Sequence, residues 1–268
     1  LGQDYTVDEQ IKAGMLVVGD EILLGMTQDT NTIGMADYLL KRGIRLKRWV
    51  IAPDEENEII LSLRRLIDDG FSPVMISGGM GPTHDDLTVP SVAKALGLEI
   101  VRSEDSFQRM YEKWKGRHPG EEMEESSRKG LEKMAHIPRG FDCIENSSGM
   151  AEGLVGRPEG TDAVIFILPG VPGEYRSVME NRKFLENLPD HRDGNVSIVE
   201  MPYNGRESQI AALLERFQRD FPPVEIGSYP RGQGEVMVRI TGTPDDVERA
   251  RSILAAQLEE MESGNRRC

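Results

Sequence analysis

The stretch Ser77-Gly78-Gly79-Met80-Gly81-Pro82-Thr83-His84-Asp85-Asp86-Leu87-Thr88 decides the fold of this chain. The apolar run at 74–76 in front of it is typical of a buried strand. Behind it, apolar residues recur at helical spacing over 89–96, with Thr88 as the expected N-cap and Gly97 as the expected end. The pattern predicts a strand, a glycine-rich loop and a helix in direct succession. In an open α/β sheet, loops at the carboxyl ends of strands are where ligands bind.

The glycine loop suits a phosphate group, and its carboxylates suit a metal ion. Glycines let the backbone approach a ligand closely, and free N–H groups can cradle phosphate. The loop has neither the Lys-Ser/Thr ending of a Walker A motif nor the G-x-G-x-x-G spacing of a dinucleotide fingerprint. Asp85 and Asp86 beside a phosphate favour a hard divalent cation such as Mg²⁺. The simpler alternative is a tight turn with acidic residues near a helix N-terminus, where the helix dipole favours them.

Charge and composition restrict the classes of partner. The 268 residues carry a formal net charge of −14, so the chain repels polyanions and we expect no nucleic acid partner. Any phosphate site must then be local, made by backbone amides, a metal ion or a few cations. The two cysteines, Cys143 and Cys268, form neither a disulfide framework nor a C-x-x-C metal pair. No apolar stretch reaches transmembrane length and residues 1–13 lack a signal-peptide pattern, so we expect no membrane partner and a cytoplasmic location.

Strands and helices alternate through the first two thirds of the chain. Apolar runs predict strands over 15–18, 45–51, 74–76 and 164–168. Three predicted helices begin near Asp29 or Thr30, at Asp54 and at Thr88. A helical segment is predicted over 103–135, with a break at 116–120, and a last helix runs from the turn at 169–173 to about Leu188. The face of the first helix that packs inward is expected to carry Ile33, Ala36 and Leu40. This alternation predicts right-handed βαβ units and a three-layer α/β fold with a mostly parallel sheet.

Within 103–135 the sequence indicates packing rather than ligand binding. Phe107, Met110, Tyr111 and Trp114 recur at helical spacing and are expected to form a packing face. The acidic run at 121–125 is expected to be a solvated surface.

The last quarter of the chain predicts a second, smaller unit. The polar, turn-rich segment 189–194 is the expected domain boundary. Beyond it the patterns predict a β-α-β-β-α order, which makes a small two-layer α+β domain. We therefore divide the sequence into a loose N-terminal tail at 1–13, a main domain at 14–190 and a small α+β domain at 191–268.

Two further loops bring glycine and acid to the ends of predicted strands. Gly19-Asp20-Glu21 follows the first strand, and Pro169-Gly170-Val171-Pro172-Gly173-Glu174 follows the strand at 164–168. The small-residue loop 146–153 is a third segment that can approach a ligand. As alternatives without a ligand, Asp20 bonds loop amides and Glu174 favours the first turn of a helix.

Taken together, these motifs resemble the CinA family (competence/damage-inducible protein A). Its first domain is of the molybdopterin-binding MoaB/MogA type, a fold that also occurs in one domain of eukaryotic FAD synthases. The motifs that carry the resemblance are Val18–Gly25, Asp29-Thr30-Asn31, Gly78–Thr88, Leu168–Glu174 and Ile226–Pro230. They cover roughly residues 14–263, including the small unit, which resembles the family's second domain. The sequence has no counterpart of the C-terminal nicotinamide-mononucleotide deamidase domain of full-length CinA proteins, and we expect no such activity of these residues.

The resemblance implies a metal-dependent hydrolase of nucleotide diphosphates, an ADP-ribose- or FAD-like pyrophosphatase that uses Mg, Mn or Co. The metal is then expected on Asp85, Asp86, Asp20 and Glu21, with Asp86 favoured over Asp85. Asp85, Asp86 and Glu174 are the expected catalytic residues, Glu174 orienting or deprotonating water. The residues expected to bind phosphate or the rest of the substrate are Gly78, Gly79, Met80, Gly81, Thr83, Thr88, Asn31, Asn146, Gly149, Pro169 and Gly170.

Two alternatives remain open on this sequence. The chain is alternatively a molybdopterin-binding protein of molybdenum-cofactor biosynthesis, since a pterin phosphate would use the same glycine loop. It is otherwise a non-catalytic nucleotide-binding module. The sequence also departs from the family: Glu152 stands where a proline is common, and Val171 interrupts a Gly-Pro-Pro turn. The partner expected from the resemblance is a small nucleotide or pterin, with the chain forming a homo-oligomer as its relatives do.

Overall fold

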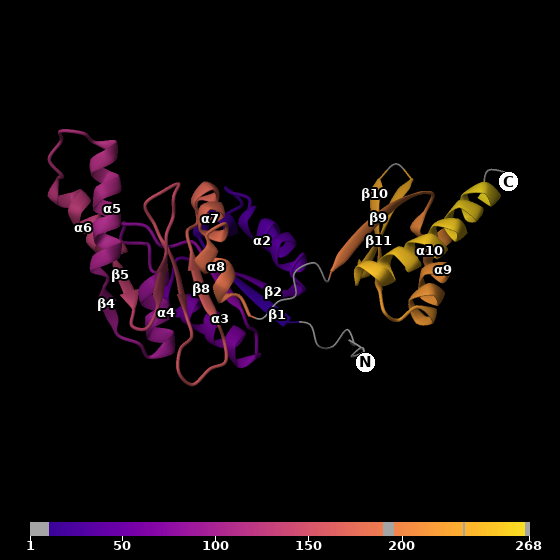
Figure 1. The fold of residues 1–268 in the computed structure, drawn as a ribbon, viewed down its shortest axis with the longest axis horizontal. Coiled ribbons are helices and arrows are strands. Elements are labelled where there is room, and N and C mark those ends of the chain that lie inside the picture. Colours follow the sequence, from indigo (N-terminus) through magenta and orange to yellow (C-terminus); the bar gives the residue numbers. More distant parts are fainter. Residues whose placement is uncertain (1–10, 190–195, 233, 266–268) are drawn as a thin grey trace. The chain divides into compact units, whose positions relative to one another are not determined.

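A computed structural model describes residues 11–189, 196–232 and 234–265 (Figure 1). Contacts between Cα atoms divide the chain into two compact units. The larger contains Ile11–Tyr38 and Ile44–Asp190, and the smaller contains Leu39–Gly43 together with the residues after 190. The boundary segment expected at 189–194 falls almost wholly outside the described residues, as do the first ten residues of the expected tail.

A six-stranded sheet forms the centre of the larger unit. Its order is β2 (Ile44–Ala52), β1 (Ile11–Val18), β3 (Val74–Ser77), β8 (Ile165–Leu168), β7 (Gly153–Gly156) and β6 (Asp142–Ile144). The first four strands are mutually parallel, and β7 is antiparallel to both of its neighbours. The predicted mostly parallel α/β sheet is therefore confirmed, while β6 and β7 lay in segments with no predicted strand.

Strand β1 begins earlier than the sequence pattern indicated. Ile11, Lys12 and Ala13 pair with β2, so these three residues of the expected loose tail belong to the sheet. Ala13 is completely buried. The apolar pattern missed them because a lysine and two small residues precede the run Met15–Val18.

Helices cover both faces of this sheet (Figure 1). α3 (Glu56–Asp68) and α4 (Thr88–Leu96) share one buried cluster with alternate residues of the strands, including Leu16, Ile76 and Ile167. On the other face, Phe184 of α8 (Arg182–Asn187) packs on Phe166 of β8 at 4.7 Å between ring centroids. α1 (Asp20–Leu23), α2 (Asn31–Leu40) and α7 (Pro172–Met179) complete the unit. The expected three layers are present.

Several local predictions for these helices were wrong. α2 buries Thr32, Met35 and Leu39, whereas Ile33 is 57% exposed. The Asp29 carboxylate accepts from the Thr32 amide at the start of this helix. Asp54 does not cap α3, whose N-cap is Glu55, and Thr88 is the first residue of α4 rather than its cap. The single helix expected up to Leu188 is divided into α7 and α8, since Asn181 caps a new helix by accepting from the Lys183 amide.

A helical excursion lies between α4 and β6. It consists of β4 (Ile100–Arg102), α5 (Glu104–Arg117), α6 (Glu125–Met134) and β5 (His136–Pro138), with β4 and β5 paired antiparallel. α5 and α6 lie side by side (Figure 1) and bury Phe107, Met110 and Leu131 between them. The predicted packing face on 107–114 is confirmed, and the acidic residues at 121–125 are exposed as expected.

The smaller unit has the predicted β-α-β-β-α order. Its elements are β9 (Ser197–Asn204), α9 (Glu207–Asp220), β10 (Glu225–Gly232), β11 (Glu235–Gly242) and α10 (Pro244–Asn265). The strands form an antiparallel sheet in the order β10-β11-β9. Both helices pack on it around a core of its own that includes Tyr203, Phe217 and Leu254. No helix in the described part of the chain combines the length and the apolarity that a membrane crossing needs.

Candidate functional site

A cavity of about 410 Å³ opens where β1, β3 and β8 end. The loops that follow these three parallel strands meet there, as the sequence predicted for strand ends that carry glycine and acid. The lining includes predicted site residues from all three loops: Glu21, Asn31, Gly78, Gly79, Met80, Gly81, Thr83, Asp85, Asp86, Pro169, Gly170 and Glu174.

Glycine is required at the base of this cavity. Gly78 has φ +100°, and a Cβ atom built there would lie 2.1 Å from the carbonyl oxygen of Val18. Gly79 has φ +60°, and its Cβ would lie 2.4 Å from the Thr88 hydroxyl. These close approaches bring the ends of β1 and β3 together under the loop.

The glycine loop presents backbone donors. The Gly78 amide donates to the Leu168 carbonyl at 3.1 Å. The amides of Gly79, Met80 and Gly81 have no hydrogen-bond acceptor among the described residues. Three successive N–H groups without a protein acceptor, on residues that line a cavity, form a cradle suited to phosphate oxygens.

Asp86 closes the loop on itself. Its Oδ2 accepts from the Thr83 amide at 2.9 Å and from the Thr83 hydroxyl. Lys133 of α6 donates to the Thr83 carbonyl and holds the same turn from outside. Asp86 is half-buried and already bonded, whereas Asp85 is exposed. The nearby Thr83 hydroxyl, followed by the loop's own amide, His84 and Lys133, keeps the pKa of Asp85 below its ordinary value.

An acidic group gathers on the β1 side of the cavity. Asp54, two residues after the end of β2, accepts from the Asp20 amide at 2.9 Å. Burial raises the pKa of Asp54, and the negative charges of Asp20, Glu21 and Asp85 raise it further, against the hydrogen bond from Asp20. Asp54 lines the cavity and was missed as a site residue, although its place after a strand of the parallel sheet was a usable signal.

The cavity lining contains no Lys, Arg or His side chain among the described residues. Within the same residues, no three His, Cys, Asp or Glu side chains converge closely enough to hold a metal ion by themselves. The carboxylates present are nevertheless the hard oxygen donors that Mg²⁺ and Mn²⁺ prefer, and Mg²⁺ is commonly held by one or two carboxylates together with substrate phosphates and water. Burial is the largest cause of the raised pKa of Asp54, and the negative charges of Asp20, Glu21 and Asp85, which add to it, are charges that a cation would neutralise.

The third loop is fixed to the other two. Asn31 of α2 donates from Nδ2 to the Gly170 carbonyl at 2.8 Å, and the Ser77 hydroxyl donates to the Pro169 carbonyl at 3.2 Å. Glu174 accepts from the Met150 amide at 3.1 Å through Oε1. A Cβ atom built on Gly149 would lie 1.6 Å from that oxygen, so Gly149 leaves the space in which the Glu174 carboxylate sits.

Four expected ligand residues are not part of the cavity lining. Thr88 is completely buried beneath Gly79, and Gly149 is buried behind Glu174. Asn146, also fully buried, donates to the Ala151 carbonyl and accepts from the amides of Ser148 and Gly149, so it shapes its own loop. Asp20 is exposed beside the cavity and contacts Asp54 through its amide. The sequence could not separate residues that shape these loops from residues that face a ligand.

Comparison with protein families assigns both units. Residues 14–186 match the family described as "Probable molybdopterin binding domain". Residues 196–265 match "FAD synthase, middle domain". Residues 187–195 lie between the two matches.

Individual relatives come from archaea and bacteria. Protein PH0439 of Pyrococcus horikoshii is 34% identical over 88% of this chain and 91% of its own length. A CinA protein of unknown function from Thermoplasma acidophilum has a crystal structure that covers 66% of this chain and 96% of that chain, with 32% identity and a TM-score of 0.55. The molybdopterin biosynthesis enzyme MoaB of Thermus thermophilus covers 63% of this chain and 87% of its own, with 21% identity and a TM-score of 0.41.

Proposed function

This chain belongs to the CinA family through a domain of the molybdopterin-binding family, and from that premise we propose that its cavity binds the phosphate of a pterin of the molybdopterin kind together with a divalent cation. The cradle of Gly79, Met80 and Gly81 amides is the observation that carries the proposal. A phosphate group accepts from such amides without any basic side chain.

The acidic lining supports the cation. A phosphate ligand in a cavity with Glu21, Asp54, Asp85 and Asp86 and no basic side chain meets uncompensated negative charge. A divalent cation held by these carboxylates would neutralise the charge of the phosphate and so offset that repulsion. Asp85 is the candidate ligand from the glycine loop, because Oδ2 of Asp86 is already bonded to Thr83.

The same carboxylates favour a second function, hydrolysis of a nucleotide diphosphate. In this reaction a water oxygen attacks one phosphorus, the bond from that phosphorus to the bridging oxygen breaks, and each product leaves with a phosphate. The bound cation would supply charge neutralisation of the phosphates. Glu174, whose carboxylate lines the cavity and is oriented by the Met150 amide, is the residue placed to take the proton of the water. The match of the smaller unit to a domain of FAD synthase supports a nucleotide as substrate.

Calorimetric titration tests the binding step. We expect neopterin phosphate and pyrophosphate to bind the wild-type chain in the presence of Mg²⁺ and to lose most of that affinity with a chelator. Asp85→Asn should weaken cation-dependent binding at least tenfold, since the variant removes the charge of an exposed carboxylate and leaves the core intact. Asp162→Asn, an exposed aspartate before β8 and outside the cavity lining, is the matched control and should bind normally.

Product analysis separates the two functions. ADP-ribose and FAD are incubated with the same protein and Mg²⁺, Mn²⁺ or Co²⁺, and AMP is measured by chromatography. AMP release that Glu174→Gln abolishes favours the hydrolase. Binding of neopterin phosphate without AMP release favours the pterin function, and absence of binding by every phosphate compound contradicts both.

A further inference from the structure

A second hollow of about 510 Å³ lies against the phosphate cradle. Gly81, Ala151, Val171 and Glu174 line both cavities, so the two hollows adjoin through these residues. The second one extends from the glycine loop along α5 and α6 and reaches the start of α7.

The chemistry of this second hollow differs from that of the first. Its walls are formed mainly by Pro82, Trp114, Leu131, Met134 and Met150, and Glu174 at the shared edge is its charged residue. Trp114, Met134 and Met150 are each half-buried and pack at the edge of the small core between α5 and α6. Trp114 also stacks on His118, with 4.6 Å between ring centroids. An aromatic ring and two thioethers at the rim of a core are groups that contact planar rings favourably.

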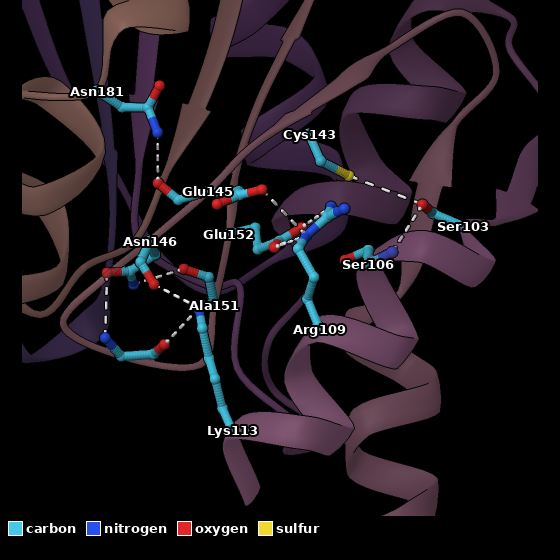
Figure 2. A network of polar contacts seen from close by, with 11 residues as sticks. Ser103, Ser106, Arg109, Lys113, Cys143, Glu145, Asn146, Ala151, Glu152 and Asn181 are labelled. Atoms are coloured by element: carbon cyan, nitrogen blue, oxygen red, sulfur yellow. Dashed lines mark hydrogen bonds and ion pairs between the residues drawn. The ribbon is translucent and has the colours of Figure 1, made fainter. Parts of the chain in front are cut away.

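The excursion that carries this wall is tied to the loops of the phosphate site. Lys113 of α5 donates to the carbonyls of Asn146 and Gly149 (Figure 2). Arg109, one turn earlier, makes a bidentate pair with Glu152 at 2.7 and 2.8 Å. On α6, Lys133 donates to the Thr83 carbonyl.

Close packing fixes the glycine loop to α6 as well. A Cβ atom built on Gly130 would lie 2.9 Å from Pro82, so Gly130 allows the loop to approach the helix. The wall and the cradle are therefore held in one fixed arrangement rather than as independent surfaces.

We propose that the second hollow receives the planar heteroaromatic ring of the ligand whose phosphate occupies the cradle, with Trp114 as its principal contact. The inference rests on the proposed function for the phosphate end. A ligand with an anionic end and a flat apolar end matches two adjoining hollows, one lined by amides and carboxylates and the other by Trp114, Met134 and Met150. The chemical class is a phosphorylated pterin or purine, since both rings are flat and carry a phosphate through a short linker.

Paired ligands test this inference. Pyrophosphate reports on the cradle alone, whereas neopterin phosphate and ADP-ribose report on both hollows. We expect Trp114→Ala to weaken neopterin phosphate or ADP-ribose by about 5- to 150-fold, the range that corresponds to loss of one ring-stacking contact. Pyrophosphate should bind this variant as it binds the wild type.

Two more variants keep the test independent of folding. Trp114→Phe retains an aromatic ring and should restore most of the affinity for the ring-bearing ligands. Ser127→Phe, a substitution on α6 in the wall of the hollow, adds bulk without removing a core residue and should weaken the ring-bearing ligands only.

The outcomes distinguish the proposed phosphate-binding function from the proposed ring site. Failure of pyrophosphate and of both ring-bearing ligands to bind the wild type overturns the proposed function. Binding of pyrophosphate, with ring-bearing ligands that Trp114→Ala and Ser127→Phe leave unaffected, overturns the ring site alone.

Discussion

Several single residues at this site shape the loops around the cavity and do not themselves face a ligand. Gly78 permits the end of β3 to lie against the carbonyl of Val18, and Gly149 permits Glu174 to reach the Met150 amide. Thr83 supplies both donors that hold Asp86. The groups that remain to meet a ligand are the backbone amides of residues 79–81 and the exposed carboxylate of Asp85.

Asp54 provides a pH-dependent test at the residue scale. Its pKa in the folded chain is raised above 3.8, so its charged form is disfavoured by folding. The folded chain then binds more protons at this group than the unfolded chain does, and its contribution to stability falls as pH rises from 3.8 through the raised value. Asp54→Asn keeps an oxygen for the Asp20 amide and removes the charge. We expect the variant to be more stable than the wild type at pH 7, with the difference vanishing towards pH 3.

Urea midpoints at the two pH values measure this effect, with and without Mn²⁺. A bound cation neutralises the repulsion between Asp54 and the carboxylates of Asp20, Glu21 and Asp85. Mn²⁺ should therefore stabilise the wild type more than Asp54→Asn. A variant that is less stable than the wild type at pH 7 without metal would contradict this account of Asp54.

At the scale of elements, periodic patterns made part of the fold predictable. Long apolar runs and helical stripes located β1, β3, β8, α3 and α4, and therefore the strand ends at which the cavity forms. β4, β5, β6 and β7 are three or four residues long and were missed because, unlike the equally short β3 and β8, they do not stand out as apolar runs: polar residues, proline or glycine interrupt or bound them. The contacts of α5 and α6 with the loops were also unpredictable, because a helical sequence pattern does not distinguish the half-buried Arg109, Lys113 and Lys133 from solvated surface residues. Tertiary packing alone places them.

The pair Arg109–Glu152 joins α5 to the loop that ends in β7. The Glu152 side chain is 2% exposed and that of Arg109 is 33% exposed, so removing the arginine leaves a buried charge without its main partner. Glu152 also raises the pKa of Arg109, so the guanidinium stays charged. The position at which Glu152 departs from the family's common proline is thus used to fix the loop.

Arg109→Ala should destabilise the larger unit by about 3–5 kcal/mol, the usual consequence of breaking a buried ion pair. The double variant Arg109→Met/Glu152→Leu should be considerably less destabilised, because no unpaired charge remains. Chemical denaturation of Arg109→Met, Glu152→Leu and the double variant gives the coupling energy. Equal destabilisation by Arg109→Ala and by the double variant would mean that the charge of Glu152 is not the cause.

At the scale of the whole molecule, each unit has a hydrophobic core of its own. The cluster around Leu16, Ile76 and Ile167 lies in the larger unit, and the cluster around Tyr203, Phe217 and Leu254 lies in the smaller one. Every residue that lines the phosphate cradle or the adjoining hollow belongs to the larger unit. Ligand binding by the cavity should therefore depend on the stability of the larger unit's core and not on that of the smaller unit's core.

Leu254→Ala tests this separation. Leu254 is completely buried, and its truncation should destabilise the smaller unit by about 2–5 kcal/mol, as for other leucines in protein cores. Both tryptophans of the chain, Trp49 and Trp114, lie in the larger unit, so tryptophan fluorescence monitors that unit and calorimetry monitors the whole chain. We expect a lowered calorimetric transition with unchanged fluorescence and unchanged affinity for pyrophosphate. The neighbouring Ile253→Ala, at a side chain that is 46% exposed, should change neither transition. Loss of pyrophosphate binding in Leu254→Ala, at a temperature where the fluorescence is still native, would show that the smaller unit contributes to the site.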